Sequence, residues 1–422
     1  MEGCDTMKNE FDVIVVGGGI SGACAAIASA RQGQDVLLIE KSGFLGGAIG
    51  NMYVNPFAPY FMTENGEKIN INKGIFLEII NELKQMGGLK GNCIFNDEYL
   101  KIILDKKARE ANVTVLFHST LCDTNVANKK IKSVRVTSKL GMLEFYGTNF
   151  IDASGDANLA ASAGCPFTIG REEDSACQPM TLCFRVEGIN VEKFYANYDE
   201  TQRLYKEYQK LGKIKNPREN ILTFKHVSDN VIHLNTTRVV GLSPLDPFQI
   251  SKAEMIAREQ MYELFTFLKE KVKGCENATL MCSAPEIGVR ESRMIKGKYT
   301  ITANDILSCR DFEDSIAVGN YSIDIHSPDG SGTVMKHIEN GKYYHIPYRS
   351  LIPEGIENLL VAGRCISSTH EAQSAYRVIP IVANIGEAAG IAASISNKLK
   401  INPEEIPIKI LKTSLAENNL LF

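Results

Sequence analysis

Residues 11–22, with the sequence FDVIVVGGGISG, decide the fold of this chain. Residues 13–16 are all apolar and β-branched, which is typical of a strand covered on both faces in a parallel sheet. Three glycines follow, and residues 20–32 are rich in alanine, which favours a helix. Residues 35–40 (DVLLIE) predict a second strand, so this segment forms a complete βαβ unit.

The glycine turn between this strand and helix has the G-x-G-x-x-G spacing of a dinucleotide site. Gly17 allows the tight turn, Gly19 lets the backbone approach a pyrophosphate, and Gly22 lets the helix pack close to the strand. The helix N-terminus offers free N–H groups to the phosphates. Glu40 ends the second strand, where an acid binds the ribose hydroxyls and disfavours a 2′-phosphate. The motif alone does not distinguish FAD from NAD.

The rest of the chain predicts an α/β protein of two domains. The first is a Rossmann-like nucleotide-binding domain, a parallel sheet with a β-meander. Its further predicted helices and strands lie at residues 75–85, 96–111, 113–117, 121–127, 131–138, 142–146, 149–153, 358–362 and 378–396.

The composition changes after about residue 185. Residues 190–225 are polar and rich in lysine, and residues 251–273 predict one long amphipathic helix between strand-like segments at 230–240 and 278–284. We therefore predict that residues 166–295 form an inserted α+β domain that caps the substrate site. Residues 1–165 and 296–422 then form the discontinuous nucleotide-binding domain.

Composition excludes several classes of protein. The 422 residues carry a net charge of −4, which argues against a mainly electrostatic nucleic-acid binder. The eleven cysteines are odd in number and never spaced C-x-x-C, which disfavours a disulfide framework, a zinc ribbon or an iron–sulfur site. We expect no metal and a reducing, cytoplasmic location. Residues 1–10 lack the apolar run of a signal peptide, and glycines interrupt the uncharged residues 13–30, so we expect no membrane span.

Distant segments favour FAD over NAD. The loop KSGFLGGA at 41–48, the strand IDASGD at 151–156, the strand LLVAGR at 359–364 and the helix GEAAG at 386–390 resemble the segments of flavoproteins that contact FAD. The chain resembles FAD-dependent oxidoreductases related to the fumarate reductase and succinate dehydrogenase flavoproteins, and more narrowly a bacterial branch of them. The signatures of that branch lie at 151–174, 178–188, 288–307, 311–326 and 345–380. The chain departs from the branch at Ser154, usually Thr, and at Ala157, usually Gly.

This resemblance implies a non-covalent FAD held by residues from both ends of the chain. Cys365 follows the last strand, but buried free cysteine is a common core residue and we expect no covalent link through it. The implied FAD-binding residues are Gly17, Gly19, Ile20, Ser21, Gly22, Glu40, Lys41, Gly46, Gly47, Ala48, Ser154, Gly155, Asp156, Gly363, Arg364 and Gly386.

Arginines and histidines in the matched segments are the candidates for substrate binding and catalysis. The resemblance suggests that Arg290, Arg293 and Arg377 bind a carboxylate or carbonyl group. The alternative is that these arginines pair with Glu286, Glu291 or Glu371 at the domain interface. His326 and His370 are candidates for proton transfer, because an unperturbed imidazole titrates near neutrality; the alternative is a structural role. Tyr376 is a candidate hydrogen-bond donor or a wall of the pocket.

These observations predict an FAD-dependent oxidoreductase, a dehydrogenase or reductase. It would transfer hydride between flavin N5 and a small organic substrate that is anionic or bears a carbonyl. Two alternatives stay open, namely an electron-transfer subunit that works with a redox partner protein and a non-catalytic flavin-binding module. The electron donor or acceptor also stays open and could be NAD(P)H or a protein, and the protein could form an oligomer. We expect neither a nucleic-acid partner nor a membrane partner.

Overall fold

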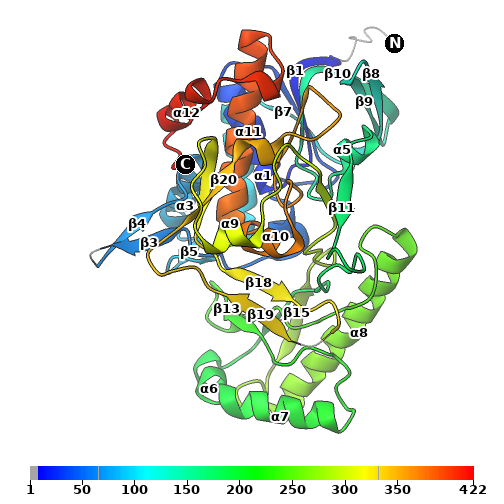
Figure 1. Cartoon of the computed structure of the whole chain (residues 1–422). Coiled ribbons are helices and arrows are strands. Elements are labelled where there is room, and N and C mark those ends of the chain that lie inside the picture. Colours follow the sequence, from blue (N-terminus) through cyan, green and yellow to red (C-terminus); the bar gives the residue numbers. More distant parts are fainter. Residues whose placement is uncertain (1–7, 65, 331) are drawn as a thin grey trace.

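The computed structural model describes residues 8–64, 66–330 and 332–422. Figure 1 shows two bodies, one above the other. The upper body holds the main sheet and both ends of the described chain, and the lower body contains the helices α6 (Val191–Ala196), α7 (Tyr198–Lys210) and α8 (Pro247–Lys271).

The main sheet confirms the predicted α/β class. Its strand order is β7-β2-β1-β10-β9-β8, and β21 also pairs with β10. The pairs β1–β2, β1–β10, β2–β7 and β10–β21 are all parallel. All four residues of β2 are buried, as expected for a strand that is covered on both faces. The strands are β1 (Glu10–Val16), β2 (Val36–Ile39), β7 (Thr114–Leu116), β8 (Thr120–Ala127), β9 (Lys130–Ser138), β10 (Gly141–Asp152) and β21 (Leu359–Val361).

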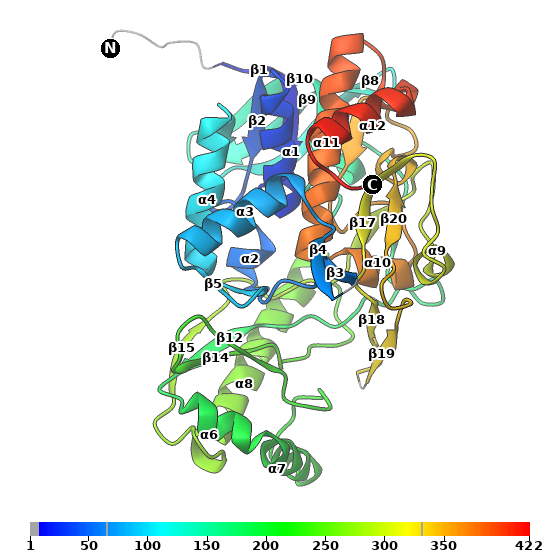
Figure 2. The same ribbon diagram turned by 90° about the vertical axis from the view of Figure 1, so that its left-hand side faces the viewer.

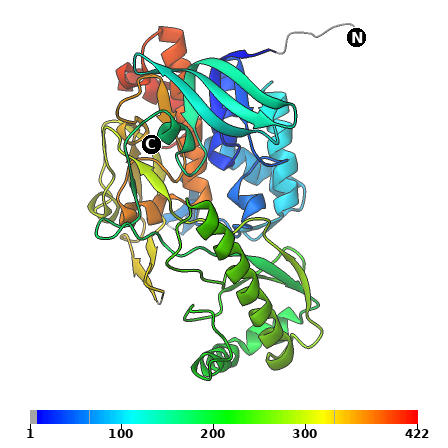
Figure 3. The ribbon, with the colours of Figure 1, turned by 90° about the vertical axis from the view of Figure 1, so that its right-hand side faces the viewer.

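One prediction in this sheet is wrong. The segments 142–146 and 149–153 are a single strand, β10, whose first half pairs antiparallel with β9 and whose second half runs parallel to β1 and β21. The predicted break lies at residues 147–148, yet a Cβ on Gly147 would lie 3.1 Å from the Ile14 side chain. This glycine therefore serves close packing inside a strand. Figure 3 shows the long meander strands at the opposite end of the molecule from the lower body.

Two long helices pack face to face beside the sheet. These are α1 (Ile20–Arg31) and α11 (Ile379–Leu399). A Cβ on Gly386 would lie 2.0 Å from the Ser21 carbonyl oxygen, so the backbones approach at a distance that only glycine permits. In the described part of the chain, α11 is the single helix long and apolar enough to cross a membrane, and its apolar window is wholly buried inside the protein.

The lower body has its own apolar core, formed by buried residues between Met180 and Ile287. Its sheet has the antiparallel order β13-β14-β12-β15, visible beside α8 in Figure 2. The strands are β12 (Phe184–Glu187), β13 (Thr223–Lys225), β14 (Val231–Leu234) and β15 (Thr279–Ser283). The domain limits 166–295 stay a prediction. Helix α8 begins four residues earlier than predicted because Asp246 caps it, accepting N–H bonds from Phe248 and Gln249, and Pro247 takes the first helical position.

The remaining elements connect and cover these two cores. The remaining helices are α2 (Ala48–Asn51), α3 (Gly74–Gln85), α4 (Asp97–Glu110), α5 (Asn158–Ser162), α9 (Ala303–Leu307), α10 (His370–Tyr376) and α12 (Ile408–Glu417). The remaining strands are β3 (Phe61–Glu64), β4 (Glu67–Asn70), β5 (Leu89–Lys90), β6 (Ile94–Phe95), β11 (Phe167–Ile169), β16 (Arg293–Ile295), β17 (Ser315–Gly319), β18 (Ile323–His326), β19 (Thr333–Lys336) and β20 (Tyr344–Pro347).

Candidate active site

A cavity of about 590 Å³ lies at the carboxyl edge of the parallel strands. Residues directly after β1, β2, β10 and β21 line it, which is where ligands bind in open α/β sheets. Residues of the lower body line its other side, including Thr181, Phe224 and Asn235, which lie in or beside the strands around its core. The cavity therefore lies between the two cores, as is common for ligand sites.

The glycine turn has the shape that a pyrophosphate requires. Gly17 has φ +100°, and a Cβ there would lie 2.5 Å from the Ala153 carbonyl oxygen. A Cβ on Gly19 would meet only Gly47 Cα, at 3.9 Å, so this residue leaves open space on the cavity side. Helix α1 begins at Ile20, directly behind that space, and its free N–H groups carry partial positive charge. These residues fit the diphosphate of FAD.

Glu40 is held in place by the chain itself. Its Oε2 accepts the Gly18 N–H at 2.6 Å and its Oε1 accepts the Ser42 N–H at 2.7 Å. A carboxylate has about four acceptor positions, so both oxygens keep capacity for ribose hydroxyls. Lys41 lines the cavity and forms an ion pair with Glu286 at 2.8 Å.

Asp156 connects three segments near the same end of the cavity. Its Oδ1 accepts bonds from Arg364 and Ser292, both at 2.6 Å. Burial alone would raise the pKa of Asp156, but the Arg364 charge and the Ser292 hydrogen bond outweigh it and lower the pKa. Arg293 donates to the Asp156 carbonyl oxygen and lies over the Phe167 ring, so the structure gives it a packing role outside the cavity.

Arg290 and Arg377 face the cavity without a carboxylate partner. The Arg290 Nη1 donates to the Pro179 carbonyl oxygen at 2.5 Å and to Thr181 Oγ1 at 2.6 Å. The Arg377 guanidinium donates to the Arg290 carbonyl oxygen at 3.0 Å and to Gln178 Oε1 at 2.9 Å. Neither arginine forms an ion pair within residues 8–64, 66–330 and 332–422. Burial and then the neighbouring Arg377 charge lower the pKa of Arg290 to about 9, and burial lowers the pKa of Arg377.

The alternative pairing of these arginines with glutamates is absent. Glu286 pairs with Lys41, and Glu291 accepts a bond from His370 Nδ1 at 2.7 Å. Among the described residues, the two cavity arginines therefore form no direct ion pair with a carboxylate, and an anionic or strongly polarised oxygen in the cavity could pair with them.

His326 lines the cavity beside this positive charge. Its Nε2 lies 3.7 Å from Asp324 Oδ2, and Tyr321 donates to the same carboxylate oxygen at 3.0 Å. Burial, followed by the charges of Arg290 and Arg377, strongly lowers the pKa of His326. The imidazole is thus neutral at physiological pH, which differs from the expected titration near neutrality.

Several predicted residues lie outside the cavity. His370 is buried against Glu291, and the Tyr376 hydroxyl bonds to Ser368 at 2.8 Å. Gly22 and Gly386 instead allow a helix to lie close to neighbouring backbone. A Cβ on Gly22 would lie 1.8 Å from the Gly17 carbonyl oxygen, and one on Gly386 would lie 2.0 Å from the Ser21 carbonyl oxygen. Cys365 is fully buried, and burial raises its pKa. The predicted residues that do line the cavity are Gly17, Gly19, Ile20, Ser21, Glu40, Lys41, Gly46, Gly47, Ala48, Ser154, Gly155, Asp156, Arg290, His326, Gly363, Arg364 and Arg377.

Other lining residues were missed by the sequence analysis. Asp324 and Tyr321 lie in the matched segment 311–326, close to His326, and could have been found there. Phe224 and Asn235 come from the segment without any recognised motif, so no sequence signal pointed to them.

Comparisons with known proteins place this geometry in a family. A curated relative, digeranylgeranylglycerophospholipid reductase of Methanosarcina mazei, is 30% identical over 127 residues, which are 29% of this chain and 26% of that protein. The enzyme of the same name from Methanoculleus marisnigri is 26% identical over 185 residues, 40% of this chain and 45% of that protein. The chain thus spans less than half the length of either relative.

Solved structures of similar shape share little sequence. A geranylgeranyl bacteriochlorophyll reductase-like protein from Thermoplasma acidophilum is 12% identical, with a TM-score of 0.47 over 97% of this chain and 84% of its own. The flavin-dependent brominase Bmp2 is 12% identical, with a TM-score of 0.48 over the same shares.

The family itself is shown by a match along nearly the whole chain. The family described as FAD dependent oxidoreductase matches residues 12–415, which include both the glycine turn and the arginines of the cavity. These proteins are enzymes, and FAD is the cofactor that the cavity's nucleotide end fits. The chain therefore belongs to the FAD dependent oxidoreductase family.

Proposed function

We propose that this enzyme transfers hydride between flavin N5 and a small organic substrate whose carboxylate or carbonyl oxygen is bound by Arg290 and Arg377. The observation that carries the proposal is the pair of cavity-facing guanidinium groups whose hydrogen-bond partners are all neutral. A guanidinium group that lines a cavity and forms no ion pair favours an anionic ligand.

The chain's residues have distinct tasks in this proposal. The bound flavin supplies the hydride acceptor or donor. Arg290 and Arg377 hold the substrate oxygen and stabilise negative charge that develops on it. His326, being neutral, donates a hydrogen bond to the same substrate without adding a third full charge. Phe224 and Val289 line the cavity from the lower body and offer the substrate an apolar contact.

Further parts of the proposal rest on the sequence. The resemblance of residues 345–380 supports a relation to the fumarate reductase flavoproteins and their bacterial branch. The cysteines in the described residues are all free, which supports a cytoplasmic location. The matches to the lipid reductases cover too little of those proteins for their substrate to be included here.

The test is conservative replacement of each cavity arginine. Arg290→Lys and Arg377→Lys should keep bound FAD, and at least one should lose about 10²-fold or more in turnover, because lysine cannot reproduce a bidentate contact. The assay photoreduces the flavin and measures its reoxidation by a panel of carboxylates and carbonyl compounds. Arg258→Lys, an exposed arginine on α8, is the matched control.

Three outcomes would reject the proposal. Near-normal turnover in both variants with FAD retained would remove the arginines from the site. Reoxidation only by a co-purifying protein would favour an electron-transfer subunit. Failure of every electron acceptor, small or protein, would favour a flavin-binding module without catalysis.

A further inference from the structure

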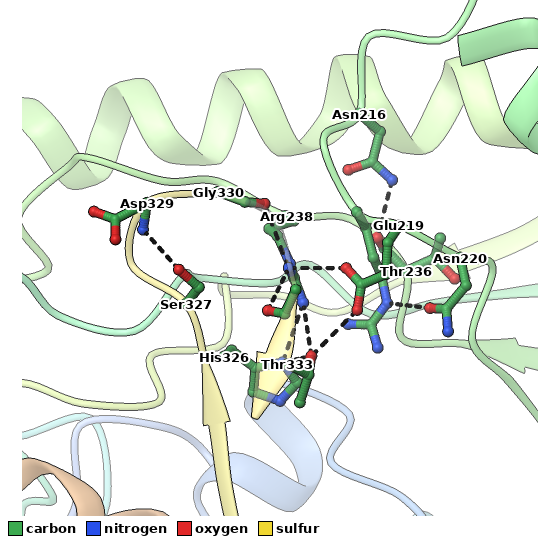
Figure 4. A network of polar contacts seen from close by, with 12 residues as sticks. Asn216, Glu219, Asn220, Thr236, Arg238, His326, Ser327, Asp329, Gly330 and Thr333 are labelled. Carbon is green, nitrogen blue, oxygen red and sulfur yellow. Dashed lines mark hydrogen bonds and ion pairs between the residues drawn. The ribbon is translucent and has the colours of Figure 1, made fainter. Parts of the chain in front are cut away.

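Arg238, which lies outside the cavity lining, contacts His326 from behind. Arg238 follows β14 in the second core, and its side chain is 1% exposed. Its Nη2 lies 3.2 Å from His326 Nδ1, and its Nη1 forms an ion pair with Glu219 at 3.0 Å. Figure 4 shows this guanidinium between Glu219 and the turn that carries His326.

The backbone of Arg238 is also fixed. Its N–H donates to Gln260 Oε1 at 2.8 Å, and its carbonyl oxygen accepts from Gln260 Nε2 at 2.9 Å. Arg238 Nη1 further donates to the carbonyl oxygens of Gly330 and Gly332 at 3.4 and 3.3 Å. Gln260 on α8 therefore holds the backbone of Arg238, while the carbonyl oxygens of Gly330 and Gly332 and the His326 ring hold its guanidinium.

A guanidinium can only donate hydrogen bonds, so the ring nitrogen that faces it must carry a lone pair. We propose that Arg238 is a positioning residue that locks His326 as the tautomer with the proton on Nε2. That nitrogen is the one beside Asp324, and both side chains line the cavity. At 3.7 Å the Asp324 contact is too long to be a hydrogen bond, so the Nε2–H is free for a substrate oxygen. This last role rests on the proposed function, whereas the tautomer does not.

A rival assignment involves Thr333. Its Oγ1 lies 3.3 Å from His326 Nδ1 and 3.3 Å from Glu219 Oε1. If Thr333 donated to Glu219, its oxygen could accept a proton from Nδ1 instead. In that arrangement the hydrogen on His326 Nδ1 would face a hydrogen on Arg238 Nη2, and these two nitrogens are only 3.2 Å apart. We therefore favour the assignment in which Nδ1 accepts a hydrogen bond from Arg238.

Burial, and then the surrounding guanidinium charges, lower the pKa of the His326 ring. Asp324 lies on the same strand, Arg238, Arg218 and Glu219 belong to the second core, and Arg290 and Arg377 face the ring from the cavity. The hydroxyl of Tyr321 is held by Asp324. Four guanidinium groups against two carboxylates oppose a second proton on the imidazole.

The experiment measures the tautomer in the full-length holoprotein. With ¹⁵N-labelled histidine, long-range ¹H–¹⁵N correlation spectra show which ring nitrogen carries the proton, and His326→Gln identifies the signal. We expect the Nε2–H form between about pH 5.5 and pH 8.5, the range in which ordinary histidine titrates. Arg238→Met should shift the tautomer ratio by about tenfold or more toward Nδ1–H, or restore titration in this range. Thr333→Val should leave the Nε2–H form unchanged.

The controls separate a local effect from a general one. Arg258→Met on the exposed face of α8 should change neither the spectrum nor the FAD content. If Arg238→Met does not fold, Arg238→Gln replaces it, because glutamine is neutral and two heavy atoms shorter than arginine. This variant must then show the same shift in the tautomer ratio of His326. An Nδ1–H or doubly protonated ring in the wild type, or an unchanged ring in both Arg238 variants, would overturn the lock. If the lock holds but no carboxylate or carbonyl compound reoxidises the flavin, the proposed function fails and the positioning role stands.

Discussion

Glu40 completes the glycine turn, and we predict that it also contacts the nucleotide. Its carboxylate accepts the N–H groups of Gly18 and Ser42, and it lines the cavity. Glu40→Ala should weaken FAD binding by about 1.5–3 kcal/mol, the value of hydrogen bonds to a charged group. Equilibrium dialysis against free FAD measures the change, with exposed Glu98→Ala as the control. An unchanged Kd in a folded Glu40→Ala variant would show that the nucleotide does not contact this acid.

Glu387 makes the stability of the protein depend on pH. It is buried in α11, and its Oε2 accepts the Ile75 N–H at 2.9 Å. Burial raises its pKa from the ordinary 4.5 to about 8. Between these two values the folded protein keeps a proton that the unfolded chain has released, so stability falls as pH rises, by at most about 1.4 kcal/mol per pH unit.

The expected result for Glu387→Gln follows from this fall in stability with rising pH. The amide oxygen can still accept the Ile75 N–H, and no charge develops on it. Relative to wild type, the variant should therefore gain stability as pH rises from 5 to 8. Urea unfolding at several pH values measures the difference, and a difference that stays constant with pH would contradict the raised pKa.

At the scale of the elements, the contact between α1 and α11 depends on two glycines. A Cβ on Gly386 would lie 2.0 Å from the Ser21 carbonyl oxygen, and one on Gly390 would lie 2.1 Å from the Ala25 carbonyl oxygen. In an uncrowded helix, Gly→Ala stabilises by about 1 kcal/mol. Here we expect Gly386→Ala to destabilise by about 1–3 kcal/mol, because the helices must separate. Thermal unfolding gives the sign directly, and a rise in Tm would refute the close approach.

Strand β10 shows the same dependence on packing. Its residues around Gly147 have a turn-like composition, but the strand continues because partners lie on both sides of it. Local composition therefore predicted the wrong boundary.

At the scale of the whole molecule, one buried ion pair joins the two cores. Asp97 at the start of α4 and Arg185 on β12 lie 2.8 Å apart, with side chains 4% and 7% exposed. Asp97→Ala should cost about 3–5 kcal/mol, because it leaves the Arg185 charge buried and unpaired. The double variant Asp97→Ala with Arg185→Met should be more stable than Asp97→Ala alone. Denaturant unfolding of the three variants tests this, and strictly additive losses would mean that the pair is not coupled.

The part of the candidate site that lies within one continuous segment could be predicted from the sequence. The turn, the helix N-terminus and Glu40 follow one another within a single βαβ unit, so their spacing alone brings them together. Of the residues that the resemblance suggested for chemistry, Arg290 and Arg377 line the cavity, whereas His370 and Tyr376 do not. The roles of all four in catalysis stay a prediction. His370 lies two helical turns, about 10 Å, from Arg377 along α10, and Tyr376 points about 100° away from it around the helix.

The sequence by itself determined the βαβ unit with its glycine turn, because that unit follows from periodicity and from spacing within one short segment. The FAD-dependent oxidoreductase class came from the resemblance of several distant segments to flavoproteins. Only the tertiary structure decided which arginines remain without a carboxylate, that His326 is neutral, and that Arg238 contacts it. Arg238 and His326 are 88 residues apart in the chain and belong to different bodies. Their contact, and the burial that lowers the pKa of the imidazole, exist only once the second core has packed onto the first.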